Sequence, residues 1–133
     1  MTTAKVLDSY SVIAFFENEK GSDKVAELLR QARDKSRPLL LSAVNWGEVY
    51  YIALRTAGRD TAEKILLAID TLPIEVIPTG REITKIAAEF KAFKKMSYAD
   101  CFAAALAKVR KAQVVTGDKE FKEVEDVISI FWI

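Results

Sequence analysis

The sequence predicts a three-layer α/β/α sandwich built on a mainly parallel sheet of four to five short strands. Short apolar runs, most of them rich in valine and isoleucine or ending in a turn signal, alternate with longer segments of helical period. A helix between successive strands calls for a right-handed crossover, which makes neighbouring strands parallel and covers both faces of the sheet. No internal repeat or linker-like tract interrupts this alternation, so we expect residues 1–133 to form one domain.

Five segments are predicted strands and six are predicted helices. The strands are Val6–Leu7, Leu39–Leu41, Ile74–Ile77, Val114–Val115 and Val127–Ile130. The helices cover residues 10–18, 22–35, 43–57, 60–71, 80–93 and 98–110. Gly58 stands where the third helix should end, because glycine is common just past helix C-termini. Three pairs have the spacing of a capping box, namely Asp60 with Glu63, Thr79 with Glu82 and Ser97 with Asp100.

The composition limits the possible chemistry. Half of the 133 residues are apolar, enough for a core that removes about two-thirds of the unfolded chain's surface from water. The chain contains no histidine, which excludes imidazole acid/base catalysis, Ser-His-Asp triads and zinc sites with imidazole ligands. The net charge of +1 gives no overall electrostatic preference for nucleic acid.

The single cysteine and the hydropathy pattern favour a cytoplasmic location. Cys101 precedes Phe102 and a run of alanines, a context typical of a packed thiol, and one cysteine cannot form an internal disulfide. No apolar stretch approaches the ~18 residues of a membrane span. The N-terminal residues also lack the basic and apolar regions of a secretory signal. We therefore expect a cytoplasmic protein without membrane contact.

Four carboxylates stand at the ends of apolar segments. Asp8 follows the first predicted strand and Asp118 follows the fourth. Asp100 falls in the first turn of the sixth helix, and Glu48 lies early in the third. Because ligands of open α/β sheets collect beyond the carboxyl ends of the strands, we expect Asp8, Asp100 and Asp118 at one edge of the sheet. Glu48 lies early enough in its helix to reach the same place.

A pocket lined by these acids predicts a cation site. Carboxylates held close together either take up protons or attract positive charge. All the available ligands are oxygens, which favours Mg²⁺ or Mn²⁺ over zinc. Such cations, held by acids beside a bound phosphate, are a common apparatus for phosphodiester cleavage. The sequence leaves open whether one ion or two would bind.

Each acid also has a purely structural interpretation. Asp8 could cap the helix after the first strand, Asp100 could complete a capping box, and Asp118 could occupy a turn. Glu48 is the hardest to explain in this way. It lies in an apolar stretch of its helix, where a buried glutamate without a partner is costly.

The four acids lie in four segments that follow one another along essentially the whole chain: Val6–Tyr10, Asn45–Val49, Ser97–Cys101 and Thr116–Phe121. In this order and spacing the sequence resembles the PIN-domain nucleases, and among them the VapC-type toxins of toxin–antitoxin pairs. The resemblance implies an α/β/α domain in which the acids bind Mg²⁺ or Mn²⁺. Asp8 and Asp100 are then the expected direct ligands, with Glu48 and Asp118 holding a second ion or its waters.

Two further positions acquire roles through this resemblance. Thr116 matches a position that is often polar and close to the metal, so it is a candidate for a catalytic hydroxyl that orients substrate or water. Tyr10 stands where many relatives carry a small polar residue. Ser9 or Ser11 would then supply the missing hydroxyl, and the sequence does not choose between them.

The activity implied is hydrolysis of RNA phosphodiester bonds by a metal-dependent endoribonuclease. The implied partners are an RNA substrate, a VapB-like antitoxin and a second copy of the chain in a homodimer. Candidates for phosphate contact, each with a solvated-surface alternative, are Lys94, Lys95, Lys119, Arg55 and Arg59. Tyr98 and Trp46 are candidates for base stacking, with packing as the alternative.

Other functions remain open at this point. A nuclease of the same fold could process cellular RNA without being a toxin, and a non-catalytic binding module could retain the fold. A phosphatase with an aspartate nucleophile would usually need a second aspartate where Tyr10 stands. A receiver domain would need a phosphoacceptor aspartate after the third strand, where Pro78-Thr79-Gly80 follows instead.

Overall fold

The computed structural model describes residues 3–133, so residues 1 and 2 of the predicted domain lie outside the described range. The strands are β1 (Lys5–Leu7), β2 (Leu39–Ser42), β3 (Ile74–Ile77), β4 (Gln113–Thr116) and β5 (Ile130–Trp132). The helices are α1 (Ser9–Phe16), α2 (Ser22–Asp34), α3 (Ala43–Ala57), α4 (Arg59–Thr71), α5 (Arg81–Phe93) and α6 (Tyr98–Arg110), with a 3-10 helix, η1, at Lys119–Val124. The predicted helices agree with these bounds within two residues.

The five strands form one sheet in the order β3-β2-β1-β4-β5. Every pairing between neighbours is parallel, with Val6 opposite Leu40 on one side and Val114 on the other. The predicted parallel α/β sheet is therefore confirmed. Because β1 occupies the centre, the residue that follows it lies in the middle of the carboxyl edge of the sheet.

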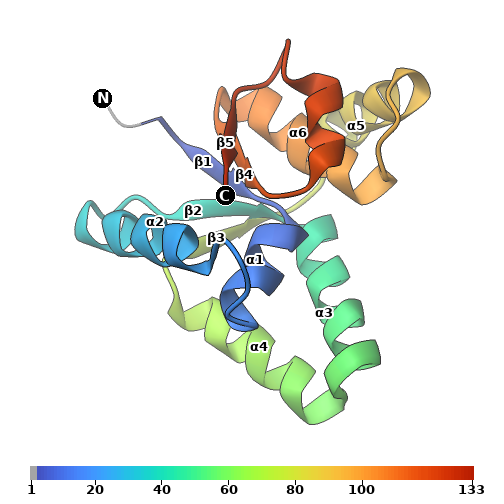
Figure 1. The fold of residues 1–133 in the computed structure, drawn as a ribbon. Coiled ribbons are helices and arrows are strands. Elements are labelled where there is room, and N and C mark those ends of the chain that lie inside the picture. The colour runs from blue at the N-terminus through green and yellow to red at the C-terminus, as the bar shows by residue number, and fades with distance from the viewer. Residues whose placement is uncertain (1–2) are drawn as a thin grey trace.

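Two apolar cores lie on opposite faces of this sheet and make it the middle layer of three. Successive strand residues alternate between the faces. Val6, Leu40 and Val114 pack on one face against α5, α6 and η1. Their neighbours Leu7, Leu41 and Val115 pack on the other face against α1, α2, α3 and α4. Figure 1 shows α5 and α6 on one side of the strands and α1, α2 and α4 on the other.

The predicted fifth strand was wrong in position. It was expected at Val127–Ile130, whereas β5 begins at Ile130. The backbone N–H groups of Val127 and Ile128 both donate to the carbonyl of Val124, at 3.0 and 2.8 Å, and close the turn after η1. They are therefore not available to the sheet, and β5 begins only after Ser129.

Two of the three predicted capping boxes were also wrong. Gly58 and Gly80 precede α4 and α5, and neither offers a side chain to cap the helix. Gly58 has a φ of 88°, a left-handed conformation that favours glycine, and it ends α3 as predicted. The third box is half confirmed: the hydroxyl of Ser97 accepts a hydrogen bond from the backbone N–H of Asp100 at 3.2 Å.

Within residues 3–133, no helix is both long enough and apolar enough to cross a membrane. Cys101 is a free, buried thiol, as expected from its context.

Candidate functional site

Asp8 lies at the centre of the carboxyl edge and is completely buried. It follows β1 directly and caps α1: its Oδ1 accepts a hydrogen bond from the backbone N–H of Ser11 at 2.8 Å. The hydroxyl of Ser11 in turn contacts the backbone N–H and carbonyl of Asp8. The capping interpretation of Asp8 is therefore confirmed, and it uses one of the two carboxylate oxygens.

The other oxygen of Asp8 is held by Thr116, the last residue of β4. The Thr116 hydroxyl donates to Oδ2 of Asp8 at 2.5 Å and accepts from the backbone N–H of Asp118 at 2.9 Å. Thr116 is itself completely buried. Its hydroxyl thus connects the acid that follows β1 to the acid that follows β4, and its proton is directed at Asp8.

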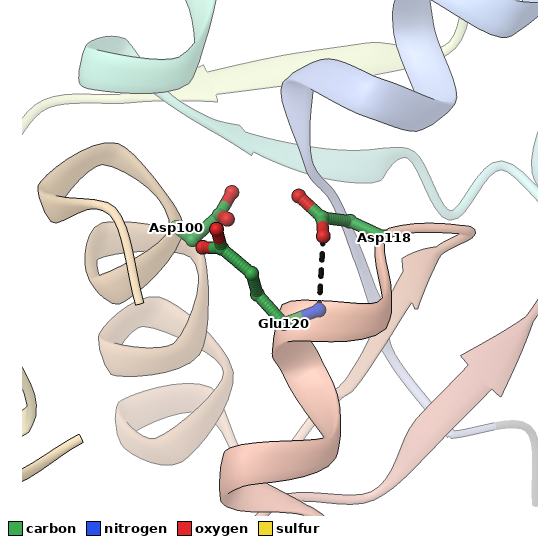
Figure 2. Close-up of side chains that lie close together, drawn as sticks. All are labelled: Asp100, Asp118 and Glu120. Atoms are coloured by element: carbon green, nitrogen blue, oxygen red, sulfur yellow. Dashed lines mark hydrogen bonds between the residues drawn. The ribbon is translucent and has the colours of Figure 1, made fainter. Parts of the chain in front are cut away.

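Asp100, Asp118 and Glu120 bring three carboxylates together beside this pair. One oxygen from each lies within 4.8 Å of the others. Asp100 comes from the first turn of α6, Asp118 from the turn after β4, and Glu120 from η1. Figure 2 shows the three side chains converging, with the backbone N–H of Glu120 donating to Oδ1 of Asp118 at 2.9 Å.

The sequence interpretation did not assign Glu120 a role. It is exposed, and it stands two residues after Asp118, where an acid looks like an ordinary turn residue. Its Oε1 accepts from the backbone N–H of Ser97 at 2.9 Å, supplying the half of the α6 capping box that Asp100 does not supply. A neighbour in η1, Glu123, accepts from the backbone N–H of Lys95 at 3.0 Å. The 3-10 helix therefore holds the start of α6, which carries Asp100.

Glu48 faces the same cleft but does not belong to the group of three. It is half-buried on α3, and its Oε1 accepts a hydrogen bond from the hydroxyl of Ser9. The hydroxyl of Tyr51 donates to its other oxygen at 3.4 Å. Ser9 thus contacts the side chain of an acid, whereas Ser11 acts through the helix cap.

A cleft of about 480 Å³ opens over these groups. Its lining residues are Ser9, Tyr10, Ile13, Glu19, Lys20, Glu48, Ile52, Ser97, Asp100, Asp118 and Glu120. Within residues 3–133, Lys20 is the cation among them, and the basic residues named from the sequence lie elsewhere. Arg55 lies over the ring of Tyr51, and Arg59 donates to the hydroxyl of Tyr50 at 3.4 Å.

The two stacking candidates from the sequence are placed differently. Tyr98 is 46% exposed and packs edge-on against Phe102. Trp46 is partly buried and packs against the core on the α1–α4 face of the sheet.

Two acids of the site have raised pKa values, and burial is the main cause for both. Burial raises the pKa of Asp8 to about 7; hydrogen bonds from Thr116 and Ser11 oppose this shift, and the charge of Asp118 adds to it. The pKa of Asp100 is raised to about 8, mainly by burial and then by the charges of Asp118 and Asp8. The site therefore holds more negative charge than it can keep ionised unaided near neutral pH.

These residues fit a hard divalent cation. The converging donors of the group of three are carboxylate oxygens, the ligand type that Mg²⁺ and Mn²⁺ prefer. A cation would also offset the repulsion that raises the pKa of Asp100. The site combines a group of acids that could hold a cation with an open cleft, an arrangement that suits hydrolysis of a phosphate ester.

Comparison with protein families gives one match that covers most of the chain. The model of the family described as "PIN domain" matches residues 5–127. No curated protein matches the sequence significantly.

Solved structures share the fold. A chain from the DNA-bound VapBC complex of Salmonella typhimurium superposes with a TM-score of 0.79 at 18% identity, covering 98% of each chain. One from the VapBC2 complex of Rickettsia felis, bound to a promoter DNA fragment, gives 0.76 at 17% identity, again over 98% of each. VapC20 of Mycobacterium tuberculosis, described as a Sarcin-Ricin loop cleaving toxin, gives 0.72 at 15% identity, over 90% of this chain and 93% of that one.

Proposed function

This chain belongs to the PIN domain family, and we propose that it is a metal-dependent endoribonuclease, the toxin of a VapBC-type toxin–antitoxin pair. The observation that carries the proposal is the convergence of Asp100, Asp118 and Glu120 at the carboxyl edge of the parallel sheet, beside the buried Asp8. A structural role alone does not require three carboxylates on different elements to face one another.

The acids divide into two kinds. Asp100, Asp118 and Glu120 have oxygens that face one another, so we assign them to direct binding of Mg²⁺ or Mn²⁺. Asp8 is buried next to them with a hydrogen bond to each oxygen, and it adds negative charge that favours the cation. This assignment gives Asp118 and Glu120 a larger part than the sequence suggested, and Asp8 a more indirect one.

Thr116 and Glu48 complete the proposed machinery. The Thr116 hydroxyl is occupied by Asp8 and by the backbone of Asp118, so we assign it to positioning those acids. Glu48 faces the cleft, where its carboxylate can accept a hydrogen bond from the attacking water. Ser9 holds Glu48 in place for this task.

When bound, a divalent cation activates water and stabilises the negative charge that grows on the phosphate. The chain contributes no histidine, so we assign proton transfer to a carboxylate. Glu48 is the candidate base because it lies in the cleft outside the group of three.

Single-stranded or looped RNA is the proposed substrate, because its backbone can enter a cleft that a regular duplex cannot. The description of VapC20 as a toxin that cleaves the Sarcin-Ricin loop supports this class of substrate. The VapBC complexes among the structural neighbours support a VapB-like antitoxin as partner. A homodimer and a cytoplasmic location complete the proposal.

Cleavage of a labelled single-stranded RNA tests the proposal. The wild-type protein should cleave it in Mg²⁺ or Mn²⁺ and stop when EDTA is added. Asp100→Asn should lower the rate by at least about 100-fold, whereas Glu89→Gln, an exposed acid on α5, should leave it unchanged. Full activity in EDTA, or in Asp100→Asn, would reject the metal mechanism; no cleavage by the wild type would leave a binding module as the better account.

A further inference from the structure

Tyr10 lines the acidic cleft and leaves much of its ring in contact with solvent. It is the second residue of α1, and 43% of its surface is exposed. The cleft it shares with the acids also has two apolar lining residues, Ile13 and Ile52. One part of the cleft is therefore aromatic and aliphatic, and another part is acidic.

The ring of Tyr10 lies against the turn at Gly117, next to the acids. A Cβ atom at position 117 would lie 2.4 Å from Cε1 of Tyr10, so the close approach requires glycine. Gly117 stands between Thr116, which binds Asp8, and Asp118, which belongs to the group of three. The ring thus packs against the same turn that positions the acids.

Within residues 3–133, the hydroxyl at the polar end of Tyr10 makes no hydrogen bond to another protein group. A tyrosine that served only to fill space would be expected to bury its ring. Here the ring contacts the backbone on one side, and its remaining surface faces the cleft.

The charge of the cleft restricts what this surface can bind. Five acids line it, and Lys20 is its cation within the described residues. A phosphate placed away from the metal would meet repulsion from those acids, except beside Lys20. The π face of a nucleobase meets no such repulsion and stacks well on an aromatic ring, an interaction worth about tenfold or more in affinity.

We infer that Tyr10 stacks on a nucleobase adjacent to the cleaved phosphodiester of a single-stranded RNA, while Lys20 contacts a neighbouring phosphate. This inference rests on the proposed nuclease function. Stacking requires an unpaired base and accepts any of the four, since each has a π face. The cleft therefore selects for single-stranded character at this position, and a paired base is rejected.

The test combines substitution of Tyr10 with removal of the base that it is proposed to contact. The bond that the wild-type protein cleaves in a short single-stranded RNA is mapped first, and abasic nucleotides are then placed on either side of it. At one position, removal of the base should raise KM about tenfold for the wild type, with little change in kcat. Tyr10→Leu should raise KM about tenfold on the intact RNA and show no further loss on the abasic one. Tyr10→Phe should behave like the wild type.

A fluorescent base gives a second readout that does not depend on turnover. 2-Aminopurine at the sensitive position should be quenched on binding to wild type and Tyr10→Phe, and not on binding to Tyr10→Leu. If the increases in KM caused by Tyr10→Leu and by the abasic position multiply when the two are combined, the two changes act independently. That result would overturn stacking while the nuclease function stands. If the wild-type protein cleaves no RNA in Mn²⁺, both the function and this inference are overturned.

Discussion

The Thr116 hydroxyl lies 2.5 Å from Oδ2 of Asp8 and joins the carboxyl ends of β4 and β1 beneath the acidic cleft. Both residues are completely buried, so the bond is shielded from water. The same oxygen of Thr116 accepts the backbone N–H of Asp118. One side chain therefore fixes two of the acids relative to each other.

Replacing this hydroxyl should weaken both the fold and the metal site. Thr116→Val keeps the shape but removes the donor to Asp8 and the acceptor for Asp118. We expect it to lower the free energy of unfolding by about 1–3 kcal/mol and to weaken Mn²⁺ binding. Thr116→Ser retains the hydroxyl and should keep Mn²⁺ affinity close to wild type. Urea denaturation measures the change in stability, and calorimetry measures Mn²⁺ binding. Equal Mn²⁺ affinity in the two variants would show that the Thr116 hydroxyl does not contribute to the metal site.

Glu120 should show two separable roles. Glu120→Gln keeps an oxygen that can accept from the backbone N–H of Ser97 but removes the charge from the acid group. It should bind Mn²⁺ more weakly at nearly unchanged stability. Glu120→Ala removes both functions and should in addition lose about 1 kcal/mol of stability through the weakened α6 cap. If the two variants unfold at the same urea concentration, Glu120 does not cap the helix.

The stability of the metal-free protein should fall as pH rises. Asp8 and Asp100 have folded-state pKa values raised to about 7 and about 8. The unfolded chain releases these protons near pH 4, whereas the folded protein keeps them up to its own pKa values. Between pH 4 and the folded pKa values, the unfolded state therefore binds fewer protons than the folded state. The stabilising contribution is thus complete below about pH 4 and is lost as pH rises through the folded pKa values.

Melting curves recorded in EDTA measure this loss. We expect Tm to fall by about 5 °C or more between pH 5 and pH 8. Asp100→Asn should show a smaller fall, because it removes one of the two titrating groups. Adding Mg²⁺ at pH 8 should raise the Tm of the wild-type protein back towards its value at pH 5. A Tm that is constant or rises with pH in EDTA would contradict the raised pKa values of the buried acids.

Gly117→Ala should displace Tyr10 while leaving the fold intact. The added Cβ would meet the far end of a half-exposed side chain, which can rotate away. Stability should change by less than about 1 kcal/mol, while KM for RNA rises as it does in Tyr10→Leu. Gly47→Ala is a matched control, because its Cβ meets open space in α3, and it should stabilise the protein by about 0.5–1 kcal/mol. A Gly117→Ala variant with wild-type KM would show that the position of Tyr10 does not affect RNA binding.

The fold could be predicted from local patterns because each strand carries its own information. Val6 and Leu7 point to opposite faces and are both fully buried, as expected for a central strand with helices on each side. The position of β5 could not be predicted in this way. Val127 and Ile130 are equally apolar, and what separates them is the turn closed on the carbonyl of Val124.

The acids at the ends of strands could be found for a similar reason: Asp8 follows β1 directly, and Asp118 follows β4 after Gly117. Contacts between distant segments could not be predicted from the sequence. Ser9 and Glu48 are 39 residues apart, and nothing local to either one predicts their hydrogen bond. Glu120 reaches Ser97 across 23 residues only because η1 turns it back towards α6. The helical turn at residues 119–124 places the third carboxylate.

Anomalous diffraction from crystals grown with Mn²⁺ tests the central claim most directly. The account predicts an anomalous peak within bonding distance of carboxylate oxygens of Asp100 and Asp118, with Glu120 as the third acid and Asp8 adjacent. A map with no peak among these carboxylates at millimolar Mn²⁺, or with Mn²⁺ bound only elsewhere on the protein, would contradict it.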